Sequence, residues 1–164
     1  MTVHDKLFIG GEWVASTGRE TLEVISPLTE ETIAKVPEAT TEDIDRAVAA
    51  ARRAFEDGPW PRMPAGERAD AIARLSAALQ ARAQQYADCI TQEMGCPSKW
   101  SLMGQVFSST MVLDTYADIA RSFAFEDRRT GGLGQPVTVR RVPVGVAAGI
   151  IPWNVPLFIM AMKL

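Results

Sequence analysis

The residues best suited to chemistry in this sequence are the adjacent Trp153 and Asn154. The carboxamide N–H of an asparagine held in a dry pocket can stabilise a developing oxyanion, which lowers a reaction barrier by about 3–4 kcal/mol in favourable cases. The neighbouring indole offers a flat apolar wall. The spacing also fits a structural role, because Asn154 lies shortly before Pro156 and can be the N-cap of the next helix. Spacing by itself favours the cap.

The segment before this pair indicates where the pair would lie. Residues 144–151 are continuously apolar, which is typical of a strand covered on both faces in a parallel sheet. In open α/β sheets, ligands bind just beyond the carboxyl ends of the strands, and residues 152–154 occupy that position. A second apolar run, 156–164, reaches the end of the sequence. Because such a run needs a partner to cover it, we expect a fold that is incomplete at its C-terminus.

Short strands followed by helices are expected upstream, so the sequence predicts an α/β fold. A Gly-Gly pair between two short apolar runs favours a hairpin, and Pro27 and Pro37 favour edge strands. Thr40 and Asp43 have the spacing of a capping box at a helix start. The predicted elements are a hairpin over 7–14, strands over 21–27 and 32–37, helices over 40–57, 64–95 and about 99–122, a loop over 130–136 and a strand over 137–142. The expected core face of the third helix is Met103, Val106, Phe107, Thr110, Leu113, Ala117 and Ala120.

Composition places the chain among ordinary globular proteins. It has 164 residues, 47% hydrophobic and 23% charged, with 17 basic and 20 acidic side chains, which is enough for one domain with a core. A net charge of −3 gives no electrostatic footprint for nucleic acid. The N-terminus lacks the pattern of a secretory signal, and the run 155–164 is too short to span a bilayer. We therefore expect neither nucleic acid nor membrane as a partner.

The two cysteines are expected to have no catalytic role. Cys89 falls inside the second helix, where we expect it to be packed, whereas Cys96 follows the helix-ending Gly95, where we expect it to be exposed and oxidisable. Two cysteines make neither a disulfide framework nor a metal site. We expect no bound metal, and we expect a reducing, cytoplasmic location.

Several segments resemble the aldehyde dehydrogenase superfamily, and they come in the same order along this chain as in that family. The run Ile-Ile-Pro-Trp-Asn-Val-Pro over 150–156, with Lys163 nine residues beyond Asn154, resembles the family's Pro-Trp-Asn segment. Residues 8–13 resemble its opening hairpin, 47–55 and 64–68 resemble its helical segments, and 140–145 resemble the strand that leads into its cofactor domain. The resemblance covers residues 6–164 and corresponds to roughly the first third of a family member.

The resemblance implies a reaction and a set of roles. In the family, a cysteine thiolate attacks an aldehyde, the thiohemiacetal gives hydride to NAD or NADP, and a glutamate-activated water releases the acid. Asn154 would then be the oxyanion donor, together with the backbone N–H of the cysteine. Lys163 would lie near the path of the deacylating water. The residues implied to line the cofactor site are Ile150, Ile151, Pro152 and Trp153.

The resemblance also implies domain boundaries and an assembly. Residues 1–136 would be the N-terminal strand and helix segment of the cofactor domain, 137–143 a bridging or oligomerisation strand, and 144–164 the truncated start of a Rossmann-like sheet. Family members are oligomers that share strands between subunits, so a homo-oligomer (dimer or tetramer) is expected.

The family's nucleophilic cysteine, its general-base glutamate and its ribose contacts all lie downstream of the matching segment. The 164-residue chain alone is therefore expected to be inactive. The choice between NAD and NADP stays open, and so does the identity of the aldehyde. The alternative is a non-catalytic truncated paralogue or interaction module.

Overall fold

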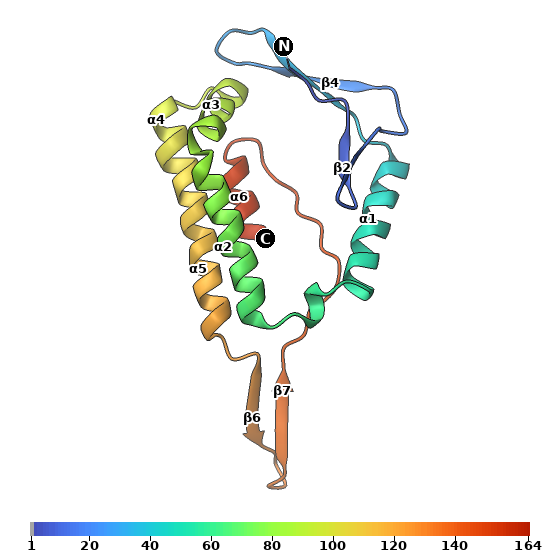
Figure 1. Cartoon of the computed structure of the whole chain (residues 1–164), viewed down its shortest axis with the longest axis vertical. Helices are drawn as coiled ribbons and strands as arrows, with labels where there is room; N and C mark the ends of the chain where they lie inside the picture. The colour runs from blue at the N-terminus through green and yellow to red at the C-terminus, as the bar shows by residue number, and fades with distance from the viewer. Residues whose placement is uncertain (1) are drawn as a thin grey trace.

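The computed structural model describes residues 2–164, with side chains from His4 onward. Figure 1 shows α2, α3, α5 and α6 gathered in one helical cluster, α1 standing apart from it, and the β6–β7 hairpin projecting at one end. The strands are β1 (Thr2–Val3), β2 (Leu7–Ile9), β3 (Glu12–Val14), β4 (Thr21–Ile25), β5 (Thr32–Pro37), β6 (Glu126–Thr130) and β7 (Pro136–Arg140). The helices are α1 (Thr41–Glu56), η1 (Trp60–Arg62), α2 (Ala65–Ala81), α3 (Ala83–Met94), α4 (Ser98–Trp100), η2 (Ser101–Phe107), α5 (Ser108–Ser122) and α6 (Pro156–Lys163). The α/β class is confirmed.

The predicted capping box at the start of α1 is confirmed. Thr40 is the N-cap, its hydroxyl accepts from the Asp43 N–H, and the Asp43 carboxylate accepts from the Thr40 N–H at 3.1 Å. That carboxylate is buried and also accepts from the Ser16 hydroxyl at 2.6 Å and the Thr17 N–H at 3.1 Å. The Ser16 hydrogen bond, followed by those from Thr40 and Thr17, holds the pKa of Asp43 well below its usual range, against the opposing effect of desolvation. One carboxylate thus ties the N-terminal loop to α1.

The small strands pair largely as expected. β2 and β3 form the predicted hairpin, with Leu7 opposite Val14, and β4 is antiparallel to β5. The expectation that residues 32–37 form an edge strand is wrong, because β5 lies between β4 and the parallel strand β1. Pro37 tolerates this position because β1 pairs only with Ala34 and Lys35 and does not reach the proline.

The helix expected over 64–95 is in fact two helices. Arg82 leaves the helical conformation (φ −118°, ψ 21°), and α3 restarts at Ala83. Gly95 ends α3 with φ 73°, as a left-handed cap. The helical stretch over 98–122 is confirmed, but its middle part, η2, is a π-helix that the periodicity did not predict.

The core lies between α2, α3, α5 and α6. Of the expected core face on the third helical stretch, Met103 and Phe107 are exposed and Ala120 is partly buried, whereas the buried members are Val106, Thr110, Leu113 and Ala117. The buried side chains form two clusters, one of Ala87, Ile90, Cys96 and Val106 and the other of Leu79, Leu113 and Ala161. Leu157 of α6 packs against both clusters.

The expectations for the two cysteines are reversed. Cys89 is exposed, because it lies off the face of α3 that buries Ala87 and Ile90. Cys96 is only 5% exposed, because the turn at Gly95 folds the chain back onto that same face.

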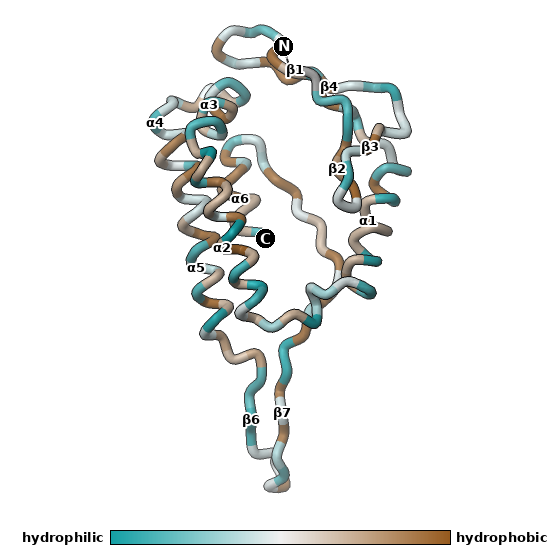
Figure 2. The backbone as a smooth tube through the Cα atoms, in the orientation of Figure 1, coloured by the Kyte–Doolittle hydropathy of each residue, from teal (hydrophilic) through white to brown (hydrophobic). Residues whose placement is uncertain are grey.

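The β6–β7 hairpin extends beyond the helices. Its antiparallel register runs from Glu126 opposite Arg140 to Thr130 opposite Pro136, and the Glu126 carboxylate pairs with the Arg140 guanidinium at 2.8 Å. β7 corresponds to the expected strand over 137–142, whereas β6 was not expected. Figure 2 shows why: β6 is hydrophilic, without the apolar alternation that marks a strand.

The strand expected over 144–151 is not formed within this chain. We call residues 142–152 the apolar connector: they are neither helix nor strand, and they run from the base of the hairpin to the turn before α6 (Figure 1). Within residues 2–164, no backbone–backbone hydrogen bond involves the connector. A strand needs a neighbouring strand to share its backbone hydrogen bonds. The connector has the apolar sequence of a buried strand but, in the part of the chain that the structure describes, no neighbouring strand with which to pair.

Candidate active site around Asn154

The turn that carries Asn154 is positioned by α6. This helix starts with Pro156, whose fixed φ suits the first helical position. Its Ala161 is fully buried against Leu79 and Leu113, and the Tyr116 hydroxyl donates to the Met162 carbonyl at 3.5 Å. Near the start of the helix, Leu157 packs against both core clusters, so α6 and the turn over 153–155 that precedes it lie against the helical cluster.

Asn154 does not cap α6, so the structural role that spacing favoured is wrong. The N-cap position is Val155 (φ −143°, ψ 59°), and no side-chain cap is made there. In the described part of the chain, the Asn154 carboxamide takes part in no hydrogen bond, and it is exposed. Asn154 is also the only asparagine in the sequence. Its amide is available to an external acceptor.

The residues implied to line the cofactor site form one exposed strip before Asn154. Ile150 and Trp153 leave 85% and 80% of their surface exposed, and Ile151 and Pro152 are also exposed. Residues 150–152 of this strip belong to the apolar connector, whose backbone is unpaired within residues 2–164, and Trp153 follows directly in the turn. It therefore presents apolar side chains and backbone hydrogen-bonding groups together, as one wall of a cleft requires.

Lys163 returns to the connector from the far end of α6. A Cβ placed on Gly149 would lie 3.8 Å from the Lys163 Cδ atom, so the lysine stem runs beside that glycine. No carboxylate of the described residues forms an ion pair with this lysine. The structure thus brings a cation to the segment that leads into Asn154.

Neither thiol in the chain is an activated nucleophile. Although Cys89 is exposed, partial desolvation of its thiol and then the charge of Glu93 raise the pKa of that thiol, which disfavours the reactive thiolate. Cys96 is enclosed in the core. In residues 2–164 no three His, Cys, Asp or Glu side chains converge as a metal site, and no helix is long and apolar enough to cross a membrane. The chemistry that this arrangement offers is hydrogen-bond donation beside an apolar wall.

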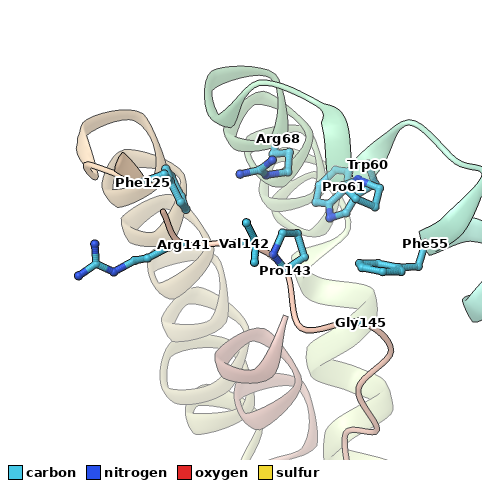
Figure 3. Close-up of a pocket in the computed structure, with 9 residues that line it drawn as sticks. All are labelled: Phe55, Trp60, Pro61, Arg68, Phe125, Arg141, Val142, Pro143 and Gly145. Atoms are coloured by element: carbon cyan, nitrogen blue, oxygen red, sulfur yellow. The ribbon is translucent and has the colours of Figure 1, made fainter. Parts of the chain in front are cut away.

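Sequence reasoning missed a hollow at the opposite end of the connector. Figure 3 shows Arg68 between Phe125 and Trp60, with Val142 and Pro143 next to them. The sequence contains only a weak indication of this hollow, because its aromatic residues come from separate helices and a loop. Only the fold brings them together.

Comparisons with known proteins agree on one family. Residues 13–164 match the aldehyde dehydrogenase family. The geranial dehydrogenase of Castellaniella defragrans is 35% identical over 167 residues, which cover 100% of this chain and 34% of that protein. An NADP/NAD-dependent aldehyde dehydrogenase of Escherichia coli is 32% identical, with coverage of 100% and 33%.

Solved structures give the same result. The crystal structure of a Mycobacterium tuberculosis aldehyde dehydrogenase complexed with NAD+ superposes with a TM-score of 0.94 and 39% identity, covering 99% of this chain and 34% of that one. The chain spans about a third of the length of the relatives that it matches.

Proposed function

The chain belongs to the aldehyde dehydrogenase family, and on this premise we propose that it is the N-terminal part of an oxidoreductase that converts an aldehyde into a carboxylic acid. The reaction would use NAD or NADP and pass through a thiohemiacetal on a cysteine. We place that cysteine outside these 164 residues, because Cys96 is buried and the pKa of Cys89 is raised. The 164-residue chain alone would then be inactive.

Asn154 is the proposed oxyanion donor, and its uncommitted side chain is the observation that carries this role. A donor that already capped a helix would have to give up that bond to serve the reaction. Asn154 makes no such bond in the described residues, yet the packed α6 fixes the turn on which it sits. A donor held in place before the reaction spends no energy on reorganisation when charge develops on the aldehyde oxygen.

The proposed cofactor wall is Ile150, Ile151, Pro152 and Trp153. Exposed apolar side chains on an unpaired backbone fit a wall against a ribose and a nicotinamide ring, and NAD+ in the similar Mycobacterium tuberculosis structure supports that cofactor class. When bound, NAD or NADP supplies the hydride acceptor. The residues of this chain would orient the ring and exclude water beside Asn154, and Lys163 would lie near the path of the deacylating water.

We also propose that the chain contributes to a larger sheet and to a homo-oligomer. Residues 1–136 would be the N-terminal segment of the cofactor domain, 137–143 the bridging strand, and 144–164 the start of the Rossmann-like sheet. The connector would take up its strand pairing from parallel neighbours. The exposed edges of the β6–β7 hairpin support a dimer or tetramer that exchanges strands. A cytoplasmic location completes the proposal.

The decisive test is Asn154→Ala in the full-length parent protein. With the other oxyanion donor and the nucleophile intact, kcat should fall by about 10²–10³-fold, while cofactor binding stays unchanged. Gln84→Ala, which removes an exposed carboxamide on α3, is the matched control and should leave kcat unchanged. Equal kcat for Asn154→Ala and the unaltered protein would refute the assigned role.

The isolated chain provides a second test. Incubated with an aldehyde and NAD+ or NADP+, material of verified intact mass should form no reduced cofactor. Turnover by such material would show that the chain carries its own nucleophile. The reading frame after Leu164 distinguishes the enzyme from the alternative, a non-catalytic module. The enzyme requires a continuation that carries a cysteine, whereas the module does not.

A further inference from the structure

A small hollow lies where α1, η1, α2 and the connector meet at the base of the hairpin. Its volume is about 300 Å³, at the lower end of the range for small-molecule sites. Figure 3 shows aromatic rings on its sides and Val142 and Pro143 at its centre. The residues that line it are Phe55, Trp60, Pro61, Arg68, Phe125, Arg141, Val142, Pro143 and Gly145.

The charged side chains that line this hollow are all positive. None of the lining residues is an Asp or a Glu, and within residues 4–164 neither Arg68 nor Arg141 forms an ion pair. Arg68 is half-buried and keeps its position because one Nη atom donates to the Met63 carbonyl and its guanidinium lies 5.5 Å from the centre of the Phe125 ring. The Arg141 guanidinium turns away from Pro143 in Figure 3. Arg68 is therefore the fixed cation of the hollow.

These features select one class of ligand. A guanidinium held by a carbonyl and an aromatic ring keeps further N–H donors in a planar fork, which matches a carboxylate. The aromatic walls suit a flat or apolar body, and the volume limits its size. An amine would be repelled by Arg68, and a neutral ligand would leave the charge without a partner.

We propose that this hollow binds a small carboxylate with an apolar body, of about the size of benzoate. The carboxylate pairs with Arg68, and the body lies between Trp60 and Phe125 against Pro143. Such a ligand joins η1 and α2 to the connector at its hairpin end, whereas Asn154 follows the other end. The site is separate from the proposed oxyanion donor and does not depend on the proposed reaction.

The first experiment is a ligand series on the intact, unaltered chain, observed by saturation-transfer NMR at neutral pH. Benzoate should bind saturably, with its ring protons receiving the transfer. Benzyl alcohol and benzylamine have the same ring without the negative charge, and they should bind at least about tenfold more weakly, because a charge-assisted pair is lost. Equal binding of the three ligands, or no saturable binding of benzoate, would overturn the proposal.

The second experiment locates the site with variants. Arg68→Gln should weaken benzoate binding by at least about tenfold, and Arg68→Lys should also weaken it, since an ammonium has no planar fork. Arg74→Gln removes an exposed arginine of the same helix and should leave the affinity unchanged. Far-UV circular dichroism checks that each variant keeps its helices. Unchanged affinity in Arg68→Gln, or an equal loss in Arg74→Gln, would place the carboxylate elsewhere and refute the assignment.

Discussion

Leu113→Ala should destabilise the chain more than an ordinary substitution, because this leucine joins three helices. Leu113 lies on α5, is only 1% exposed, and shares a cluster with Leu79 of α2 and Ala161 of α6. The substitution removes three carbon atoms, each worth about 0.8 kcal/mol of burial. The cavity left among packed helices adds to that loss. We expect the free energy of unfolding to fall by about 3–4 kcal/mol.

Urea unfolding followed by circular dichroism measures this change. The matched control is Leu133→Ala in the tip of the β6–β7 hairpin, where the same side chain is 95% exposed and its loss should change the unfolding free energy by less than about 0.5 kcal/mol. Native-state hydrogen exchange should also show faster exchange of the α6 amides in Leu113→Ala, since that helix loses its main contact. A loss of less than about 1 kcal/mol, or one equal to that of Leu133→Ala, would mean that α6 is not held by this cluster.

Three further predictions concern the cap and the thiols. Thr40→Ala should lower the unfolding free energy by about 1 kcal/mol, measured by urea unfolding, whereas Thr41→Ala at the adjacent exposed position should not; equal effects would contradict the capping role. Because the folded pKa of Asp43 is lowered, its contribution to stability is present above the unfolded pKa of about 3.9 and is lost as the pH falls below it. Urea titrations across this range should show a weaker pH dependence in Asp43→Asn, and an unchanged slope would reject the mechanism. A thiol reagent should label Cys89 in the folded chain, but more slowly than free cysteine because the pKa of the Cys89 thiol is raised. The same reagent should label Cys96 only after unfolding. Mass spectrometry of peptides measures both reactions, and labelling of Cys96 in the folded chain would contradict its burial.

Local signals predicted the elements whose determinants lie within a few residues. The capping box of Thr40 and Asp43, the turn between β2 and β3, and the left-handed Gly95 each need only neighbouring atoms, so their geometry could be predicted before the fold was known. The Pro-Trp-Asn segment likewise identified the family without any tertiary contact.

The sequence-based predictions were wrong where a segment distant in the chain decides whether a residue is buried or a strand is paired. β6 is hydrophilic and becomes a strand because β7 pairs with it, partly through Glu126 and Arg140. Cys96 is buried because the chain turns back onto α3, and the connector stays unpaired because its apolar pattern does not supply a neighbouring strand. Periodicity records which side chains avoid water, and it does not record which segment covers them.

The sequence alone thus determined the family, the start of α1 and the position of Asn154 directly after an apolar run. Only the tertiary structure decided that Asn154 caps no helix, that α6 is held by Leu113 and Ala161, and that Arg68 faces an aromatic hollow. The physical reason is the range of the interactions. Caps and turns close over three or four residues, whereas burial and charge pairing depend on segments that only folding brings together.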